Sequence, residues 1–154
     1  MEYIAHKLTK AQRVLVENKL KSLYTLPARI ESLKARSSPS ITAGYQASEV
    51  QRNSRPSSSV EKAVMLLEQL RQAEAEQRLL LRIREELDET DPDLNEIWNL
   101  RYRPKFKYTD NVVIEMMRYG NRNTYYEAKD KLLGIVADRF GVWEDYEQHK
   151  EGGP

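Results

Sequence analysis

Apolar residues recur at helical spacing in two long stretches of the first ninety residues. In the first stretch, residues 9–35, Thr9 can cap the helix and the apolar side is Leu15, Leu20, Leu23, Leu26, Ile30 and Leu33. In the second, residues 60–89, the apolar side is Val60, Ala63, Val64, Leu67, Leu70, Ala73, Leu80, Ile83 and Leu87. Both patterns predict long amphipathic helices. Pro27 lies inside the first and predicts a kink or a break there, because proline clashes with the preceding helical turn.

A segment of different composition separates the two helical patterns. Residues 37–59 hold eight serines, two prolines and a glycine among 23 residues. Such a segment buries little apolar surface to offset the entropy lost on ordering. The composition predicts a flexible linker over 37–59.

Three shorter helical patterns follow residue 90. Asp91-Pro92 is a strong start signal for a helix over about 92–101, and Thr109-Asp110 can begin a helix of about two turns. Asn121 can cap a last helix that runs to Arg139 and stops at Gly141, with Tyr125 on its inner face. The expected fold is therefore all-α, with a long N-terminal helical hairpin followed by a C-terminal helical bundle.

These patterns divide the chain into five expected segments. They are a basic amphipathic helix over 1–36, the linker over 37–59, a long acidic helix over 60–90, a helix-turn-helix domain over 91–143 and an acidic tail over 144–154.

Composition removes several classes of chemistry. The chain has no cysteine and only two histidines, His6 and His149, so cysteine-based metal sites and catalytic thiolates are excluded and a histidine-centred site would need both ends of the chain to meet. No segment has the apolar length of a membrane span or a secretory signal. We therefore expect no enzyme activity, no cofactor, no metal, no membrane contact and a cytoplasmic location.

Charge is segregated although the formal net charge is only +1. Residues 1–36 carry eight bases and three acids, whereas residues 60–96 carry five bases and eleven acids. Two amphipathic helices of opposite charge favour an antiparallel pair, either within one chain or across a dimer. We expect a homo-oligomer through helices 9–35 and 60–89.

The C-terminal segment has the layout of a helix-turn-helix, in which the final helix can enter the DNA major groove. Residues 97–131 carry eight bases against four acids, interleaved with aromatic residues, which suits phosphate contact. The first residues of such a helix face base edges, and here they are Arg122, Asn123, Tyr126 and, one turn on, Lys129 or Asp130. The alternative is that this stretch is the charged face of an ordinary packing helix.

Several stretches of the chain carry a recognisable pattern, namely Leu20 to Tyr24 with Pro27, Ile30 and Leu33, Val60 to Val64, Ile97 to Tyr102, Tyr108-Thr109 and Asn121 to Lys129 running into Leu132, Ala137 and Phe140. Together they span roughly 14–143 and resemble the sigma-factor-like helix-turn-helix of RinA/ArpU-type phage late-gene transcriptional regulators. Asn121 stands where the family has a capping serine, and Tyr119 where it has the turn glycine.

The resemblance implies a DNA-binding regulator, most simply an activator of late, packaging or lysis genes, that acts in the bacterial cytoplasm. In that picture Arg122, Asn123, Tyr126 and Lys129 meet bases or phosphates of double-stranded DNA. The basic residues Arg101, Arg103, Lys105 and Lys107 hold the DNA backbone. Host RNA polymerase would be the protein partner.

Three other functions remain open from the residues. A phage small terminase subunit also joins a helix-turn-helix to an oligomerising hairpin, although usually with the DNA-binding unit first. A helical adaptor that does not bind DNA would use the long helices and keep the bundle as scaffold. An enzyme would have to use carboxylates such as Glu85, Glu86, Asp88, Glu89, Asp91 and Asp93 as a divalent-metal cluster, but this run lacks calcium-loop spacing and a central glycine.

Overall fold

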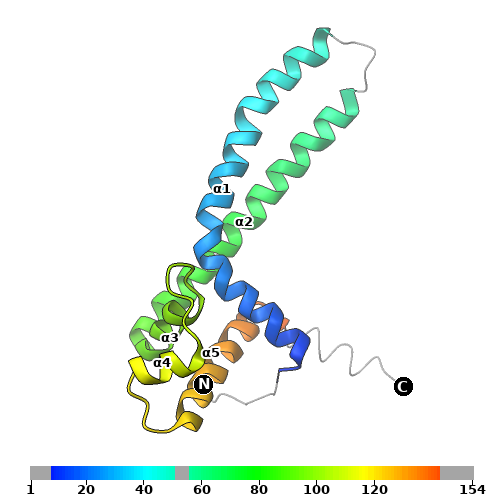
Figure 1. Cartoon of the computed structure of the whole chain (residues 1–154). Coiled ribbons are helices and arrows are strands. Elements are labelled where there is room, and N and C mark those ends of the chain that lie inside the picture. The colour runs from blue at the N-terminus through cyan, green and yellow to red at the C-terminus, as the bar shows by residue number, and fades with distance from the viewer. Residues whose placement is uncertain (1–7, 51–55, 143–154) are drawn as a thin grey trace, which may run out of the picture. The chain divides into compact units, whose positions relative to one another are not determined.

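The expected all-α fold is confirmed. A computed structural model describes residues 8–50 and 56–142, with side chains described at 8–37 and 59–142, and this part of the chain contains no strand. The helices, shown in Figure 1, are α1 (Lys10–Val50), α2 (Pro56–Thr90), α3 (Pro92–Tyr102), α4 (Asp110–Met116) and α5 (Arg122–Arg139). The predicted acidic tail at 144–154 lies outside the described residues. None of the described helices is apolar enough over a sufficient length to cross a bilayer.

The chain divides into two compact units. One unit holds residues up to Tyr24 and from Leu80 onward. It therefore contains the beginning of α1, the last part of α2, and all of α3, α4 and α5. The other unit, Thr25–Leu79, is the helical hairpin that the sequence predicts, with α1 and α2 running in opposite directions (Figure 1).

The hairpin unit buries the predicted apolar side of α1 but only part of the one on α2. Leu26, Ile30 and Leu33 of α1 are at most 7% exposed. On α2, Ala73 is buried, whereas the stretch before it exposes Val60, Val64 and Leu67 to 62%, 58% and 49%. The first part of α2 therefore presents an apolar stripe that no described residue covers.

Most of the segment predicted to be a flexible linker, 37–59, is helical in the structure. Helix α1 continues through Ser37 to Val50, and α2 begins at Pro56, so only residues 51–55 of the linker lie outside the described helices. The physical reason is that extending a formed helix avoids the nucleation cost, and alanines such as Ala43 and Ala47 favour extension. The same continuity excludes a break at Pro27.

Trp98 of α3 forms the centre of the larger unit. Its side chain is fully buried, and its indole N–H donates to the carbonyl oxygen of Leu20 in α1 at 2.9 Å. Val16 joins Leu20 in the core, whereas the predicted Leu15 is 46% exposed. Val16 is therefore the core residue in place of the predicted Leu15, while Leu20 is buried as predicted.

Candidate nucleic-acid interface

Helices α3, α4 and α5 follow one another as in a helix-turn-helix. Helix α3 packs against both α4 and α5, and residues 117–121 form the turn between α4 and α5. Thr109 caps α4 through its hydroxyl, which accepts from the Val112 N–H, as the sequence predicts. The predicted side-chain cap at Asp91 is absent, and the Asp91 carboxylate lies 3.3 Å from the Lys131 ammonium instead.

The predicted start and end of α5 are confirmed. The Asn121 side chain accepts from the Asn123 backbone N–H at 2.8 Å, which satisfies one of the free donors at the helix start. Gly141 has a φ of 73°, the left-handed conformation that commonly ends a helix.

Two of the four residues predicted to face DNA bases are freely exposed. Arg122 and Asn123 lie in the first turn of α5, and neither side chain is buried. Tyr126 is half-buried, because its ring packs edge-on against the buried ring of Tyr125 at 5.2 Å between centroids. The accessible part of the predicted base-contacting set is therefore the first turn of α5, with Tyr126 at its margin.

Lys129 is not on this surface, contrary to the prediction. Lys129 is only 4% exposed, and its ammonium lies 3.1 Å from both carboxylate oxygens of Asp110 and 3.8 Å from Glu17. An ammonium held by two carboxylates in the protein interior cannot extend into a DNA groove. Its role is to join α5 to α4 and α1.

Arg101, predicted to hold the DNA backbone, is half-buried, and its guanidinium contacts other residues of the protein. Its Nε lies 2.9 Å from Asp110, its Nη1 donates to the Tyr108 carbonyl at 2.9 Å, and its guanidinium lies over the Tyr102 ring at 5.3 Å. These contacts hold Nε, Nη1 and one face of the guanidinium within the protein.

Asp110 is the acceptor that these groups share. It pairs with Lys129 and Arg101 and accepts a hydrogen bond from the Tyr125 hydroxyl. Burial alone would raise the pKa of Asp110, but the hydrogen bonds from Tyr125 and Lys129 and the charges of Lys129 and Arg101 outweigh it and lower that pKa. Burial, reinforced by the bond to Asp110, raises the pKa of Tyr125. The pair is therefore an ionised carboxylate and a protonated phenol.

The loop between α3 and α4 keeps its predicted basic residues exposed. Arg103, Lys105 and Lys107 are all on the surface, and none forms an ion pair with a described residue. The Arg103 guanidinium lies over the Phe106 ring, which stacks on Tyr108 with an angle of 9° between the ring planes. Aromatic packing thus supports a loop whose cations are available to an anionic partner.

Arg118 is a basic surface residue that the predicted site did not include. It lies in the turn before α5, is exposed and has a φ of 59°. In this turn the left-handed position belongs to Arg118 and not to Gly120. Holding a non-glycine residue there costs on the order of 1 kcal/mol. The basic residue before Tyr119-Gly120 is the signal that could have placed Arg118 in the predicted site.

The rest of the exposed face of α5 is less suited to DNA. Glu127 is exposed one turn after Asn123, while Asp130 pairs with Arg13 of α1 at 2.6 Å. These carboxylates lower the positive charge of α5 beyond its first turn.

The acidic run considered as a metal site gains no support. Within the residues whose structure is described, no three carboxylate or imidazole groups are placed to hold a metal ion. Comparison of the chain with family models, with curated proteins and with solved structures gives no match.

Proposed function

We propose that this protein is a sequence-specific double-stranded-DNA-binding regulator whose helix α5 enters the major groove by its first turn. The observation that carries the proposal is the exposure of Arg122 and Asn123 at the capped start of α5. Arginine can bridge the O6 and N7 atoms of guanine, and asparagine can bridge the N6 and N7 atoms of adenine. The two side chains together can therefore distinguish base pairs.

The surrounding cations supply the contacts that hold DNA without reading its sequence. Arg103, Lys105, Lys107 and Arg118 are exposed on the loops before and after α4. Contacts of this kind with phosphates set orientation and non-specific affinity. The resemblance to RinA/ArpU-type regulators extends the proposal to activation of phage late genes in the bacterial cytoplasm, with host RNA polymerase as a partner.

A direct test is selection of duplexes from a random pool with the purified protein, followed by fluorescence-anisotropy titration of the selected duplex against a scrambled one. The proposal expects a preferred site bound at least tenfold more tightly than the scrambled duplex. Failure to bind any duplex at low salt would contradict it and favour the helical adaptor.

Lys105→Ala should weaken binding to every duplex by a similar factor, because an exposed loop lysine contacts phosphate rather than bases. The slope of log affinity against log salt should fall by roughly 0.9, the value for one phosphate contact. Arg82→Ala is the matched control, since Arg82 is an exposed base on α2, outside the proposed interface. If the slope of log affinity against log salt equals that of the wild type, Lys105 does not contact DNA.

Self-association through α2 is part of the proposal. Val60, Val64 and Leu67 are exposed at intervals of four and three residues, the spacing of a coiled-coil seam, so a second copy of the same helix is a fitting partner. A dimer would carry two α5 helices and favour a DNA site with two half-sites.

Val64→Lys should therefore shift the protein toward monomer. In the dimer, each chain would bury its Val64 side chain, and burying one valine contributes roughly 1.5 kcal/mol or more to the free energy of association. Losing both should therefore weaken the dimer at least tenfold. Sedimentation equilibrium over a concentration series measures the change, with Gln72→Lys, at an exposed polar position of α2, as the control. A wild-type protein that stays monomeric at high concentration would contradict self-association through this surface of α2.

A further inference from the structure

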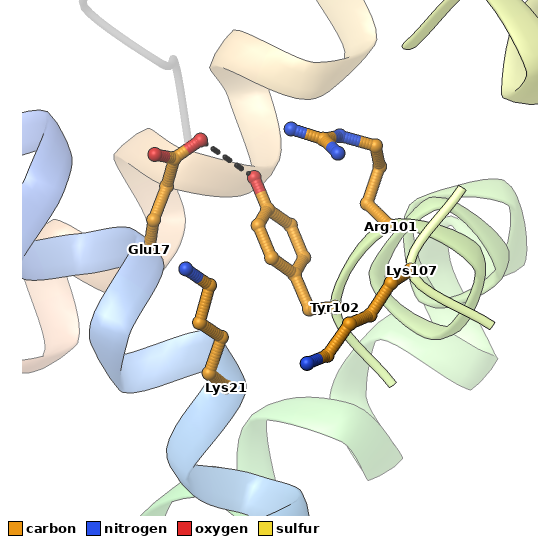
Figure 2. A pocket seen from close by; sticks show the side chains of 5 residues that line it. All are labelled: Glu17, Lys21, Arg101, Tyr102 and Lys107. Atoms are coloured by element: carbon orange, nitrogen blue, oxygen red, sulfur yellow. Dashed lines mark hydrogen bonds between the residues drawn. The ribbon is translucent and has the colours of Figure 1, made fainter. Parts of the chain in front are cut away.

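A basic pocket lies beside the α3–α4 loop, within the larger of the two units. It has a volume of about 260 Å³ and is lined by Glu17 and Lys21 of α1, Arg101 and Tyr102 of α3, and Lys107 of the loop. Figure 2 shows Lys21 and Lys107 approaching from different elements on either side of the Tyr102 side chain. Three cations and one carboxylate thus surround one cavity.

The carboxylate of the pocket is already engaged within the protein. Glu17 accepts a hydrogen bond from the Tyr102 hydroxyl at 2.9 Å, drawn in Figure 2, and lies 3.8 Å from the Lys129 ammonium. Burial, together with the charge of Glu17, raises the pKa of Tyr102, so that the phenol stays protonated and keeps donating to Glu17. Among the described residues, no ion pair joins Glu17 to Lys21 or Lys107.

The two lysines lack an anionic partner of their own. Neither Lys21 nor Lys107 forms an ion pair with a described residue, and both are exposed. Lys107 also has a φ of 50°, in a turn where its N–H and that of Phe106 both donate to the Arg103 carbonyl. Unusual backbone conformations of this kind concentrate at functional sites.

We propose that this pocket is a phosphate-binding site in which the ammonium groups of Lys21 and Lys107 hold the anion. Like charges that converge on one cavity repel each other, and an anion placed between them removes that repulsion. The Arg101 guanidinium also lines the pocket, but its ion pair with Asp110 offsets its charge, so the two lysines carry the attraction for an anion. A cavity below about 300 Å³ is smaller than most pockets for drug-sized ligands and suits a phosphate group and its immediate substituents.

The phosphate can come from two sources that share this chemistry. One is a phosphodiester of DNA, in which case the inference rests on the proposed function and adds Lys21 of α1 to the interface. The other is a free phosphate-bearing small molecule, which would bind without DNA and could act as an effector. The experiment has one arm for each source.

The first arm titrates inorganic phosphate into the full-length protein at constant ionic strength, with chloride as the replaced anion, and follows backbone amide shifts by NMR. The pocket should give saturable shifts around residues 17–21 and 101–107. Lys21→Gln and Lys107→Gln should each weaken phosphate binding at least fivefold. Lys10→Gln, at an exposed lysine of the same helix α1, should leave it unchanged.

The second arm measures duplex binding by the same variants. Loss of duplex affinity in Lys21→Gln, with competition between phosphate and DNA, supports the phosphodiester source. Unchanged duplex affinity together with saturable phosphate binding supports a free ligand.

The pocket proposal is overturned if phosphate gives no saturable shift and Lys21→Gln binds duplex like the wild type. Duplex binding that still depends on Arg122 would then leave the proposed function standing. Conversely, saturable phosphate binding by a protein that binds no duplex would support the pocket and contradict the proposed function.

Discussion

Asp110→Ala should lower the free energy of unfolding by about 3 kcal/mol, because it leaves the buried Lys129 ammonium without its closest partner. The same substitution removes the acceptor of the Tyr125 hydroxyl and the counter-charge of Arg101. Since these groups come from α3, α4 and α5, their loss should also loosen the arrangement that presents the first turn of α5. Urea unfolding at neutral pH measures the effect.

The matched control is Asn111→Ala, at the next residue of α4, whose side chain is exposed. Lys129→Met in the Asp110→Ala background should recover part of the lost stability, because it removes the buried charge and keeps the apolar stem. If Asp110→Ala cost no more than Asn111→Ala, Asp110 would not organise the interior of this unit.

The lowered pKa of Asp110 also predicts the pH dependence of stability. Because the folded-state pKa lies below the ordinary value of 3.8, the stabilisation from ionised Asp110 is fully present above that value. It is lost as the pH falls through the folded-state pKa. In Asp110→Asn, the fall in stability below pH 3.8 should be shallower than in the wild type, which unfolding curves at several pH values would show.

Local signals explain why much of this fold could be predicted from the sequence. The caps at Thr109 and Asn121 and the stop at Gly141 depend on side chains and backbone within a few residues. The sequence therefore predicts where α4 begins and where α5 begins and ends. Tyr125 is buried as its helical spacing predicts. Such features need no knowledge of distant contacts.

The roles of charged residues depend on partners far away in the sequence, which the local pattern does not contain. Lys129 looked like a surface base, yet Asp110 and Glu17 hold it inside the fold. Arg101 likewise turns toward Asp110. Counting charge over residues 97–131 therefore overestimated the cations that face solvent, although the exposed bases of the loops remain.

The start of α1 and the serine-rich segment show two further limits. Leu15 and Val16 are adjacent apolar residues, and the helical pattern alone does not decide which of them enters the core, where the structure has Val16. Serine, alanine and glutamine are compatible with either a helix or a linker, so composition alone did not reveal that α1 continues to Val50.

Arg122→Ala should reduce affinity for the preferred duplex by about 1–3 kcal/mol, a factor of roughly 5 to 150, because it removes a bidentate contact to a guanine. The loss should be confined to duplexes carrying that guanine, and the discrimination among bases at that position should disappear. Stability should not change, since Arg122 is exposed and forms no ion pair with a described residue. Anisotropy titrations against duplexes with each base pair at the position measure both effects.

Arg118→Ala is the comparison that separates base contact from phosphate contact. Arg118 lies in the turn before α5, so its loss should weaken all duplexes alike. A uniform loss in Arg122→Ala as well would assign Arg122 to phosphate and leave Asn123 as the candidate for base recognition. No loss in either variant would mean that the first turn of α5 does not meet DNA, and the exposed seam on α2 would then be the main interaction surface of the protein.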